Sequence, residues 1–255
     1  MIGISSPPFC LRKFEDVLEE VTKAGFKLWE ILADAEHSMD IVVPKLEKLA
    51  PSYDVRFQLH APMSDVNVAS VNPQIRAASV QELERALKLS SKIGVKTVTV
   101  HPGYFGPLTF GDNKTVVRMS ATYLKPVVQT ARDLGMDIVV ENMPNINVAI
   151  CTTAAETWAL ADMLGVGTCF DIGHANTTGQ MTEFLSKPGI VHNIHAHDNI
   201  GKFDEHRTIG DGNIDFKRFA AAFKGYKHNI IIEAQTTDSG VESREKLKKL
   251  FPGQD

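Results

Sequence analysis

Short apolar runs rich in β-branched residues alternate with helical segments along the whole chain. Several runs, such as Val98-Thr99-Val100 and Ile230-Ile231-Ile232, are continuous rather than alternating, which is typical of parallel strands covered on both faces. The predicted strands are Ile2–Ser5, Leu28–Leu32, Arg56–His60, Thr97–His101, Asp137–Glu141, Thr168–Asp171, Asn193–His197 and Ile230–Glu233. Because these strand–helix units follow one another without a linker, the sequence predicts a single (β/α)8 TIM barrel over residues 1–255, with a doubly wound open sheet as the alternative.

Several helix boundaries can also be predicted. Ser79–Glu82 and Thr153–Glu156 fit the capping box, in which a hydroxyl and a carboxylate bond to free amide groups of the first turn. Glycines follow four helical stretches, where glycine readily adopts the left-handed conformation that ends a helix. They are Gly25, Gly94, Gly135 and Gly165. The pattern around Met181–Gly189 is only weakly helical, so the sixth unit is the least well defined.

Length, composition and charge narrow the classes of protein. The 255 residues match the roughly 250 of a typical barrel of this kind, and 43% hydrophobic residues provide a sizeable core. No apolar run approaches the ~20 residues that cross a bilayer, and the N-terminus lacks the basic and apolar regions of a secretion signal. Cys10, Cys151 and Cys169 are an odd number without CxxC spacing, so we expect reduced thiols in a cytoplasmic protein.

Ionisable residues recur at the carboxyl ends of six consecutive predicted strands. In β/α barrels these ends and the loops after them build the active site. A single histidine or carboxylate at a strand end is more often a hydrogen-bonded structural residue than a ligand. Buried ionisable groups are costly unless they are paired or bind a metal, however, and their recurrence therefore indicates one shared site. The residues are His60, His101, Glu141, Asp171, His195, His197 and Glu233.

Two local strings supply further ligand types. Asp171-Ile172-Gly173-His174 places a carboxylate and an imidazole three residues apart on a strand-to-loop turn, where they can serve one metal or adjacent metals. Alternation puts the two histidines of the seventh strand on the same side, and Asp204 and His206 can fold back toward them from the loop. For Asp211 and Asp215 we prefer ordinary turn and N-cap chemistry.

These strings resemble the xylose isomerase-like barrel superfamily, which includes sugar and sugar-phosphate isomerases and epimerases and also endonuclease IV, the second family of AP endonucleases. The resemblance covers essentially the whole chain. Its most specific pieces are His60-Ala61-Pro62, Val100-His101-Pro102-Gly103, Val140-Glu141-Asn142, Asp171-Ile172-Gly173-His174 and the stretch from His195 to Gly212.

The resemblance implies two ligand patterns. Isomerases and epimerases of this type hold one divalent ion, Mn²⁺, Mg²⁺, Co²⁺ or Zn²⁺, and the corresponding residues are Glu141, Asp171, His195 and Glu233. Endonuclease IV holds three zinc ions with nine ligands, and all nine positions are filled: His60, His101, Glu141, Asp171, His174, His195, Asp204, His206 and Glu233. The second pattern implies phosphoester hydrolysis, because several zinc ions activate water and clamp the attacking and leaving oxygens of a phosphodiester.

Other features favour the isomerase and epimerase branch. The loop Ala33–Asp40 is acidic and would repel phosphates, and Met63 stands where the endonuclease pattern has a tyrosine that enters DNA. The net charge of -4 also makes nucleic acid the less favoured partner. We therefore favour one ion and a small-molecule sugar or sugar phosphate, with zinc-dependent cleavage of DNA at abasic sites as the alternative. No membrane partner is expected, and a homo-oligomer is compatible with this interpretation.

On the favoured interpretation, the metal polarises the substrate carbonyl as a Lewis acid. Glu141 and Glu233 then remove and return a proton on the two faces of an enediolate. The further predicted roles are catalysis for His174 and substrate binding for His60, His101 and His197. A barrel that binds a metabolite without turning it over is a third hypothesis, and the paired glutamates count against it.

Overall fold

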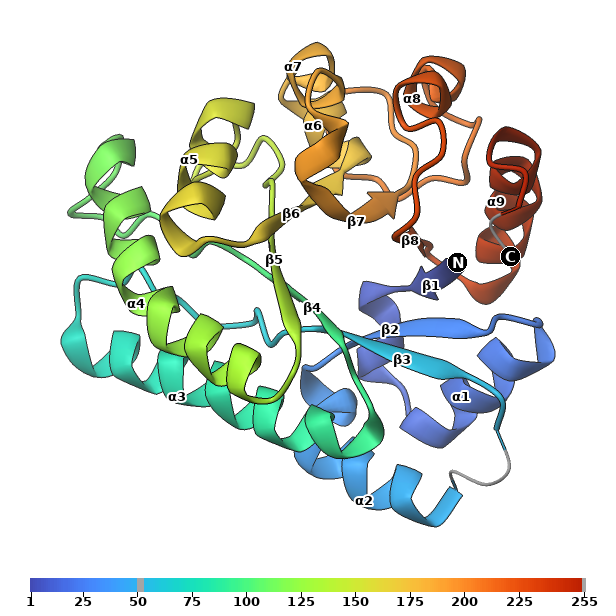
Figure 1. Cartoon of the computed structure of the whole chain (residues 1–255), viewed down its shortest axis with the longest axis horizontal. Helices are drawn as coiled ribbons and strands as arrows, with labels where there is room; N and C mark the ends of the chain where they lie inside the picture. The colour runs from blue at the N-terminus through green and yellow to red at the C-terminus, as the bar shows by residue number, and fades with distance from the viewer. Residues whose placement is uncertain (50–52, 254–255) are drawn as a thin grey trace.

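The chain folds into a closed barrel of eight parallel strands that pair in chain order (Figure 1). The structure is a computed structural model and describes residues 1–49 and 53–253. The strands are β1 (Ile2–Ser5), β2 (Leu28–Leu32), β3 (Arg56–His60), β4 (Thr97–Val100), β5 (Asp137–Glu141), β6 (Gly167–Asp171), β7 (Val191–Ala196) and β8 (Asn229–Glu233). The pairing of β1 with β8, from Ile2 opposite Ile230 to Ser5 opposite Glu233, closes the barrel. The predicted TIM barrel is confirmed, and the open sheet is wrong.

Helices connect the strands and cover the outside of the barrel (Figure 1). They are α1 (Phe14–Lys23), α2 (Met39–Leu49), α3 (Pro73–Ser90), α4 (Asn113–Asp133), α5 (Ala154–Leu164), α6 (Ile172–Thr177), α7 (Met181–Leu185), α8 (Phe216–Ala222) and α9 (Thr237–Leu250). Short 3-10 helices lie at Pro7–Leu11, Ala35–His37, Ser91–Ile93 and Pro188–Ile190. Within the described ranges, no helix combines the length and apolar character needed to cross a lipid bilayer.

The predicted strand boundaries agree with the structure to within two residues. The four helix-ending glycines are also confirmed, since their φ angles lie between 64° and 79°, which only glycine adopts without strain. Thr153 caps α5 as predicted, because its hydroxyl accepts a hydrogen bond from the amide of Glu156. The Glu156 carboxylate bonds to Asn113 instead of closing the capping box.

Two expectations about helix boundaries need correction. Ser79 does not cap a helix, because α3 begins at Pro73, whose missing amide suits the first helical position, and Asn72 caps it instead. The sixth unit contains two short helices rather than one, and the weak helical pattern corresponds to the five-residue α7. Its first helix, α6, begins directly after Asp171, so the metal-ligand string there lies on a strand-to-helix turn rather than at the start of a loop.

The outward faces of the strands form the main hydrophobic core with the helices. Trp29 of β2 stacks on Phe14 of α1, with ring centroids 5.2 Å apart. On the other side of the barrel, Phe170 of β6 stacks between Phe184 and Phe223, at 5.2 Å and 5.8 Å. Burying side chains of this size stabilises the fold by about 1.5–3 kcal/mol each. This core therefore fixes the barrel without using its interior.

The interior of the barrel is unusually polar. Barrels of this kind are ordinarily filled with layers of branched apolar side chains. Here buried polar side chains point inward from alternate positions of the strands: Glu30, Gln58, Thr99 and Asn193. Because buried polar groups cost free energy unless they are hydrogen-bonded, such a layer indicates that it supports something above it.

Candidate metal centre

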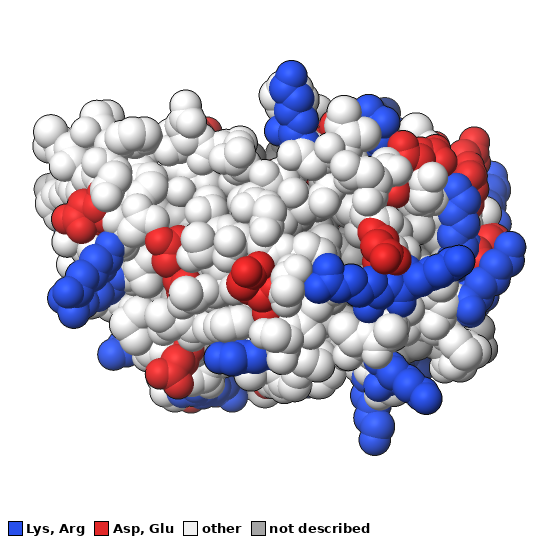
Figure 2. All heavy atoms as spheres, turned by 90° about the horizontal axis from the view of Figure 1, so that it is seen from above, with Lys and Arg blue, Asp and Glu red and all other residues white. Residues whose placement is uncertain are grey.

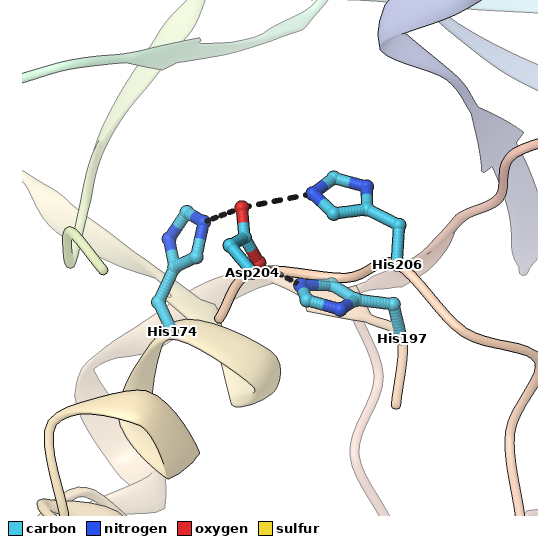
Figure 3. Close-up of side chains that lie close together, drawn as sticks. All are labelled: His174, His197, Asp204 and His206. Carbon is cyan, nitrogen blue, oxygen red and sulfur yellow. Dashed lines mark hydrogen bonds and ion pairs between the residues drawn. The ribbon is translucent and has the colours of Figure 1, made fainter. Parts of the chain in front are cut away.

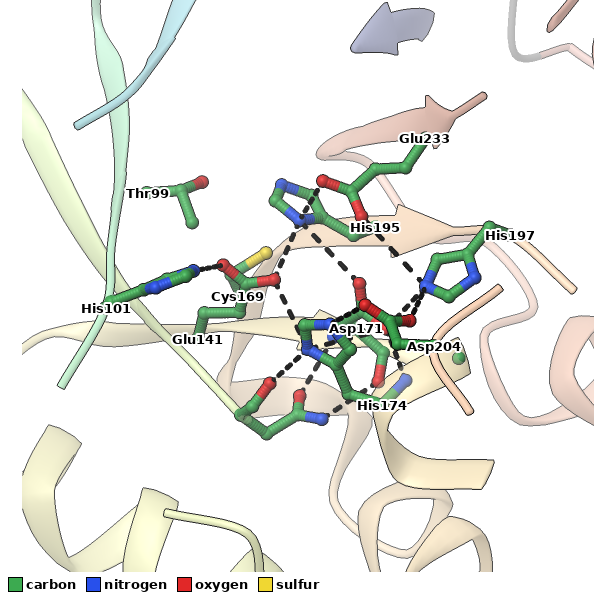
Figure 4. Close-up of polar contacts among 12 residues, drawn as sticks. Thr99, His101, Glu141, Cys169, Asp171, His174, His195, His197, Asp204 and Glu233 are labelled. Carbon is green, nitrogen blue, oxygen red and sulfur yellow. Dashed lines mark hydrogen bonds and ion pairs between the residues drawn. The ribbon is translucent and has the colours of Figure 1, made fainter. Parts of the chain in front are cut away.

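Four side chains at the carboxyl ends of β5 to β8 converge in the mouth of the barrel (Figure 4). We call Glu141, Asp171, His195 and Glu233 the central group. Nδ1 of His195 lies 3.0 Å from Oε1 of Glu141, 3.3 Å from Oε1 of Glu233 and 3.9 Å from Oδ2 of Asp171. All four side chains are buried. The structure thus brings together the four residues predicted to hold one divalent ion.

Glu141 also belongs to a second cluster at the ends of β3 and β4. Its Oε2 atom lies 3.2 Å from Nε2 of His60 and 3.2 Å from Nε2 of His101, while its Oε1 atom faces His195. We call His60, His101 and Glu141 the side group. Because the two oxygens of one carboxylate face two clusters, Glu141 has the geometry of a ligand that bridges neighbouring ions.

A third cluster joins α6 to the loop between β7 and α8 (Figure 3). We call His174, His197, Asp204 and His206 the loop group. The Asp204 carboxylate lies 3.2 Å from Nε2 of His174, 3.3 Å from Nε2 of His197 and 3.0 Å from Nε2 of His206. Four ligands at 2.0–2.1 Å around a tetrahedral ion are separated by about 3.3 Å, so these spacings suit zinc. His197, predicted to bind substrate, therefore lies among potential metal ligands.

The local backbone is shaped to form the loop group. The ring of His197 packs against Gly173, where a Cβ atom would lie 1.9 Å from Cε1 of His197. His206 has a φ angle of 48°, a left-handed conformation that costs of order 1 kcal/mol or more for a residue other than glycine. The loop itself is held by the Asp198 carboxylate, which accepts hydrogen bonds from the amides of Gly210 and Gly212. Strain and close packing are thus concentrated where the side chains converge.

Most of the imidazoles in the centre have an outer partner that orients the ring. Nδ1 of His60 donates to the carbonyl of Ala61 at 2.9 Å, and Nδ1 of His174 donates to the carbonyl of Asn142 at 2.7 Å. Both rings therefore present an unprotonated Nε2 to the centre, if they are neutral. An outer hydrogen bond of this kind is typical of metal-binding histidines, because it fixes the ring and raises its basicity.

Electrostatics in the centre also fit a bound cation. Burial opposes protonation of His60, but the neighbouring Glu141 and Glu30 carboxylates outweigh it and raise the pKa of His60 to about 9. Burial is likewise outweighed at His197, where Asp171 and Asp204 raise the pKa to about 9. Among the described atoms, Oδ2 of Asp171 and Oδ1 of Asp204 are buried without a hydrogen-bond donor. Carboxylates that hold protons on histidines would also hold a divalent ion in their place.

The two catalytic glutamate candidates differ in their protonation. Burial opposes ionisation of Glu141, but His195, His101 and His60 hold its pKa well below the usual value. At Glu233, burial is the larger effect and raises the pKa despite the neighbouring His195. Divergent pKa values within a pair of carboxyl groups are typical of sites where one group is a permanent anion and the other exchanges protons.

The sequence analysis did not identify Glu30, Tyr104 or Asp198. Glu30 lies beneath the central group, where its Oε1 is 2.8 Å from Nε2 of His195. The Tyr104 hydroxyl lies 2.9 Å from Nδ1 of His101. Glu30 stood out as the lone acid in an apolar strand, and that was the signal available. As predicted, Asp215 caps a helix, accepting from the amide of Arg218 at 2.9 Å.

A cavity of about 210 Å³ opens above the central group. Its polar floor includes His60, His101, His174, Asp204, His206, Glu141 and Glu233, and its walls include Leu32, Met63, Met143, Pro144 and Ile146. None of the described residues that line this cavity is a lysine or an arginine. The cavity therefore suits a small, largely uncharged polyol with one face of carbon atoms better than a phosphate group.

Sequence comparison with known families agrees with this geometry. The pattern of the xylose isomerase-like TIM barrel family matches residues 18–250. The chain belongs to this family. A solved structure described as a D-tagatose 3-epimerase-like protein is 32% identical and has a TM-score of 0.88, covering 98% of this chain and 96% of that chain. An uncharacterized protein of Methanocaldococcus jannaschii is 34% identical over 97% of this chain and 88% of its own length.

Two further matches are more distant in sequence. A probable endonuclease 4 of Mycobacterium leprae is 27% identical over 69% of this chain and 71% of its own length. The structure of the IolI protein with a bound zinc atom is 18% identical, with a TM-score of 0.80, and covers 100% of this chain and 99% of that chain. At this identity the IolI structure shows a shared fold. The resemblance inferred from the sequence motifs is confirmed at the level of the family.

Proposed function

We propose that this protein is a divalent-metal-dependent sugar isomerase or epimerase whose active site is the central group. The observation that carries the proposal is the pair of carboxyl groups, Glu141 and Glu233, that flank Nδ1 of His195 at 3.0 Å and 3.3 Å on the floor of the cavity. The 32% identical D-tagatose 3-epimerase-like protein supports the same class of reaction.

The residues of the central group divide the work. A divalent ion bound there would polarise the substrate carbonyl and make the neighbouring C–H more acidic. Glu233, which has the raised pKa, takes that proton and leaves an enediolate; Glu141, held as an anion by three imidazoles, acts as a ligand and as the partner on the other face. Delivery of a proton to the opposite face of the same carbon gives the epimer, and that proton would come through Glu141 from the protonated His60, whose Nε2 lies 3.2 Å from Oε2 of Glu141. Return to the former carbonyl carbon, with transfer of the hydroxyl proton, gives the isomer.

The lining of the cavity favours an unphosphorylated sugar over a sugar phosphate. A phosphate group in a protein is usually bound by arginine, lysine or a helix N-terminus. The described cavity lining has neither cationic side chain, and the apolar wall formed by Met63, Met143 and Ile146 would leave phosphate oxygens without donors. The same wall suits the carbon face of a sugar, while histidines and carboxylates face its hydroxyls.

The direct test is proton exchange at carbon. Protein loaded with Mn²⁺ would be incubated in D2O with unphosphorylated ketoses, including D-tagatose, and followed by NMR. We expect metal-dependent incorporation of deuterium at the carbon next to the carbonyl, together with an epimer or an aldose. Chelator-stripped protein and Glu233→Gln should show neither. Lack of exchange with every ketose and ketose phosphate, in protein that holds its ion, would contradict the proposal.

Phosphoester hydrolysis is the second candidate, and one observation favours it. The central, side and loop groups together provide ligands for three ions, and several zinc ions could activate water and clamp a phosphodiester. The uncharged cavity walls count against phosphoester hydrolysis. On the face of the molecule in Figure 2, acidic and basic side chains are interspersed instead of forming the basic patch that would attract DNA. About three zinc ions per chain and metal-dependent cleavage of duplex DNA 5′ to an abasic site would establish this candidate instead.

A further inference from the structure

Glu30 is a fully buried carboxylate in the interior of the barrel, on β2, outside the sets of metal ligands. Its two oxygens have different partners. Oε1 lies 2.8 Å from Nε2 of His195. Oε2 accepts hydrogen bonds from Gln58 at 2.6 Å, from Thr99 at 3.2 Å and from Asn193 at 3.2 Å.

These contacts fix which atoms around Glu30 donate hydrogen bonds and which accept them. A carboxylate can only accept hydrogen bonds, so each neighbour of Glu30 must donate to it. The amide groups of Gln58 and Asn193 accordingly turn their nitrogens toward Glu30, and the Gln58 oxygen accepts from Asn229 at 2.8 Å. Nε2 of His195 lies 2.8 Å from Oε1, an ion-pair distance without the alignment of a hydrogen bond, and this close approach to a carboxylate oxygen favours an Nε2 that carries its proton. A neutral His195 then has an unprotonated Nδ1, the atom that faces the central group.

We propose that Glu30 is a positioning residue that holds His195 in the tautomer able to bind a metal through Nδ1. The proposal rests on the metal centre proposed above. Of the four imidazoles with such outer partners, His195 has the reverse orientation, since His60 and His174 use Nδ1 for the outer hydrogen bond and Nε2 for the centre. Backbone carbonyls orient those two rings, so no side-chain replacement removes their partners. His195 depends on a side chain and is therefore open to a test.

The replacement Glu30→Gln keeps the size of the side chain but should change Nε2 of His195 from a hydrogen-bond donor to an acceptor. Three donors already surround the position of Oε2, so the glutamine oxygen would take that place. Its NH₂ group would then point at Nε2 of His195, which would have to accept the hydrogen bond. The proton would move to Nδ1, where it blocks the metal. Loss of an outer partner of a metal-bound histidine typically lowers metal affinity by about 10–100-fold.

The experiment compares Glu30→Gln with Glu30→Asp in the full chain. Zn²⁺ affinity would be measured by competition with a chelator, and the tautomer of His195 by ¹⁵N NMR of the metal-free protein at a pH where the imidazole is neutral. Aspartate is one methylene too short but remains a pure acceptor. We therefore expect affinity to fall in the order Glu, Asp, Gln, with a protonated Nδ1 in the glutamine variant. If Glu30 served only to fill space, the isosteric glutamine would be the better substitute, and that reversed order would overturn the proposal.

Thr99→Val is the matched control, because it removes a donor to Oε2 and leaves the contact between Glu30 and His195 in place. It should lower the melting temperature with less than about a threefold change in Zn²⁺ affinity; a loss as large as that of Glu30→Gln would overturn the proposal. Should the glutamine variant fail to fold, equal affinity of Glu30→Asp and the wild type would also overturn it. If the wild-type protein binds no ion, both the proposed metal centre and the proposed role of Glu30 are wrong. If it binds Zn²⁺ but converts no sugar, only the proposed reaction is wrong.

Discussion

The central group and the loop group each contain four potential metal ligands, but they are built from different parts of the fold. The central group comes from four neighbouring strand ends, and Asp171 lies opposite His195 in the β6–β7 register. The loop group combines a residue of α6 with three from the segment 197–215, and its Asp204 side chain is 25% exposed. Ligands on paired strands are held in place by the barrel itself, whereas ligands on a loop depend on how that loop folds.

Under the proposed function, this difference suits the two groups to different roles. A reaction that moves a proton between carbon atoms needs carboxylates held to within about half an ångström, which strand ends provide. A loop that carries Asp204 and His206 over the cavity is better suited to contacting and enclosing the substrate, because both residues line the cavity. On the proposed function, the chemistry would take place at the central group and the loop group would contact the substrate.

The largest effect is expected from Glu141→Ala. Glu141 contacts His60, His101 and His195, so its loss removes the carboxylate shared by the central and side groups. We expect turnover to fall by at least about a thousandfold and bound metal to be lost, because removal of a ligand from a catalytic site leaves too few donors. Metal content by mass spectrometry and turnover by NMR check both. Metal content equal to that of the wild type would show that Glu141 is not a metal ligand, and the contrast drawn between the central group and the loop group would be wrong.

The double replacement Asp204→Ala with His206→Ala tests the role of the loop group. If the loop group contacts substrate, metal content should stay unchanged and KM should rise by about tenfold, with kcat less affected. The same kinetic and metal measurements apply, and circular dichroism controls for folding. A fall of about one ion per chain would show that the loop group holds a metal, which would make the centre multinuclear and favour phosphoester hydrolysis.

The strand-built part of the centre could be predicted from the sequence, and the loop-built part only partly. Strand ends are visible in the sequence, and the closed barrel makes them converge, so Glu141, Asp171 and Glu233 needed no further information. The place of His197 depends on the path of the following loop, which Asp198 sets through backbone amides far along the chain. Glu30 was not identified because a single acid in an otherwise apolar strand does not by itself show that the side chain faces into the barrel. The assignment of nine ligand positions came from family resemblance rather than from residue spacing.

A smaller effect is expected on the stability of the metal-free protein, which should depend on pH through His60 in the side group and His197 in the loop group. The pKa values of His60 and His197 are about 9 in the folded chain, against about 6.5 when unfolded. Groups with raised pKa values stabilise the fold fully below pH 6.5, and this contribution disappears as the pH rises through 9. Metal-free protein should therefore lose roughly 10–20 °C in Tm between pH 6.5 and 9.

Metal-loaded protein should show the opposite trend, since ligand histidines must be deprotonated and affinity rises with pH. The separation between the two melting curves should thus widen toward pH 9. His60→Gln and His197→Gln, measured separately by calorimetry, would divide the alkaline loss between the side group and the loop group. A metal-free Tm that stays flat over this range in the wild type would contradict the ion pairing that we describe.

The smallest effect is expected from Tyr104→Phe, which probes whether the side group matters to the central ion. The variant removes one contact, the hydroxyl 2.9 Å from Nδ1 of His101, while the Tyr104 backbone keeps its hydrogen bonds to the Asn67 side chain. Burial raises the pKa of Tyr104 to about 12, so the hydroxyl is neutral at working pH and makes an ordinary hydrogen bond. Such a bond contributes about 1 kcal/mol, and the His101 side chain is 12% exposed, so water can take the place of the hydroxyl.

With a single ion in the central group, His101 acts on that ion only through Glu141, and Tyr104→Phe should change metal affinity and kcat/KM by less than about fivefold, with Tm nearly unchanged. Titration with Zn²⁺ and steady-state kinetics on one preparation are sufficient. A loss of affinity above about fiftyfold would mean that His101 binds an ion directly. The side group would then be a metal site in its own right, and the preference for one ion, on which the assignment of isomerase chemistry depends, would be wrong.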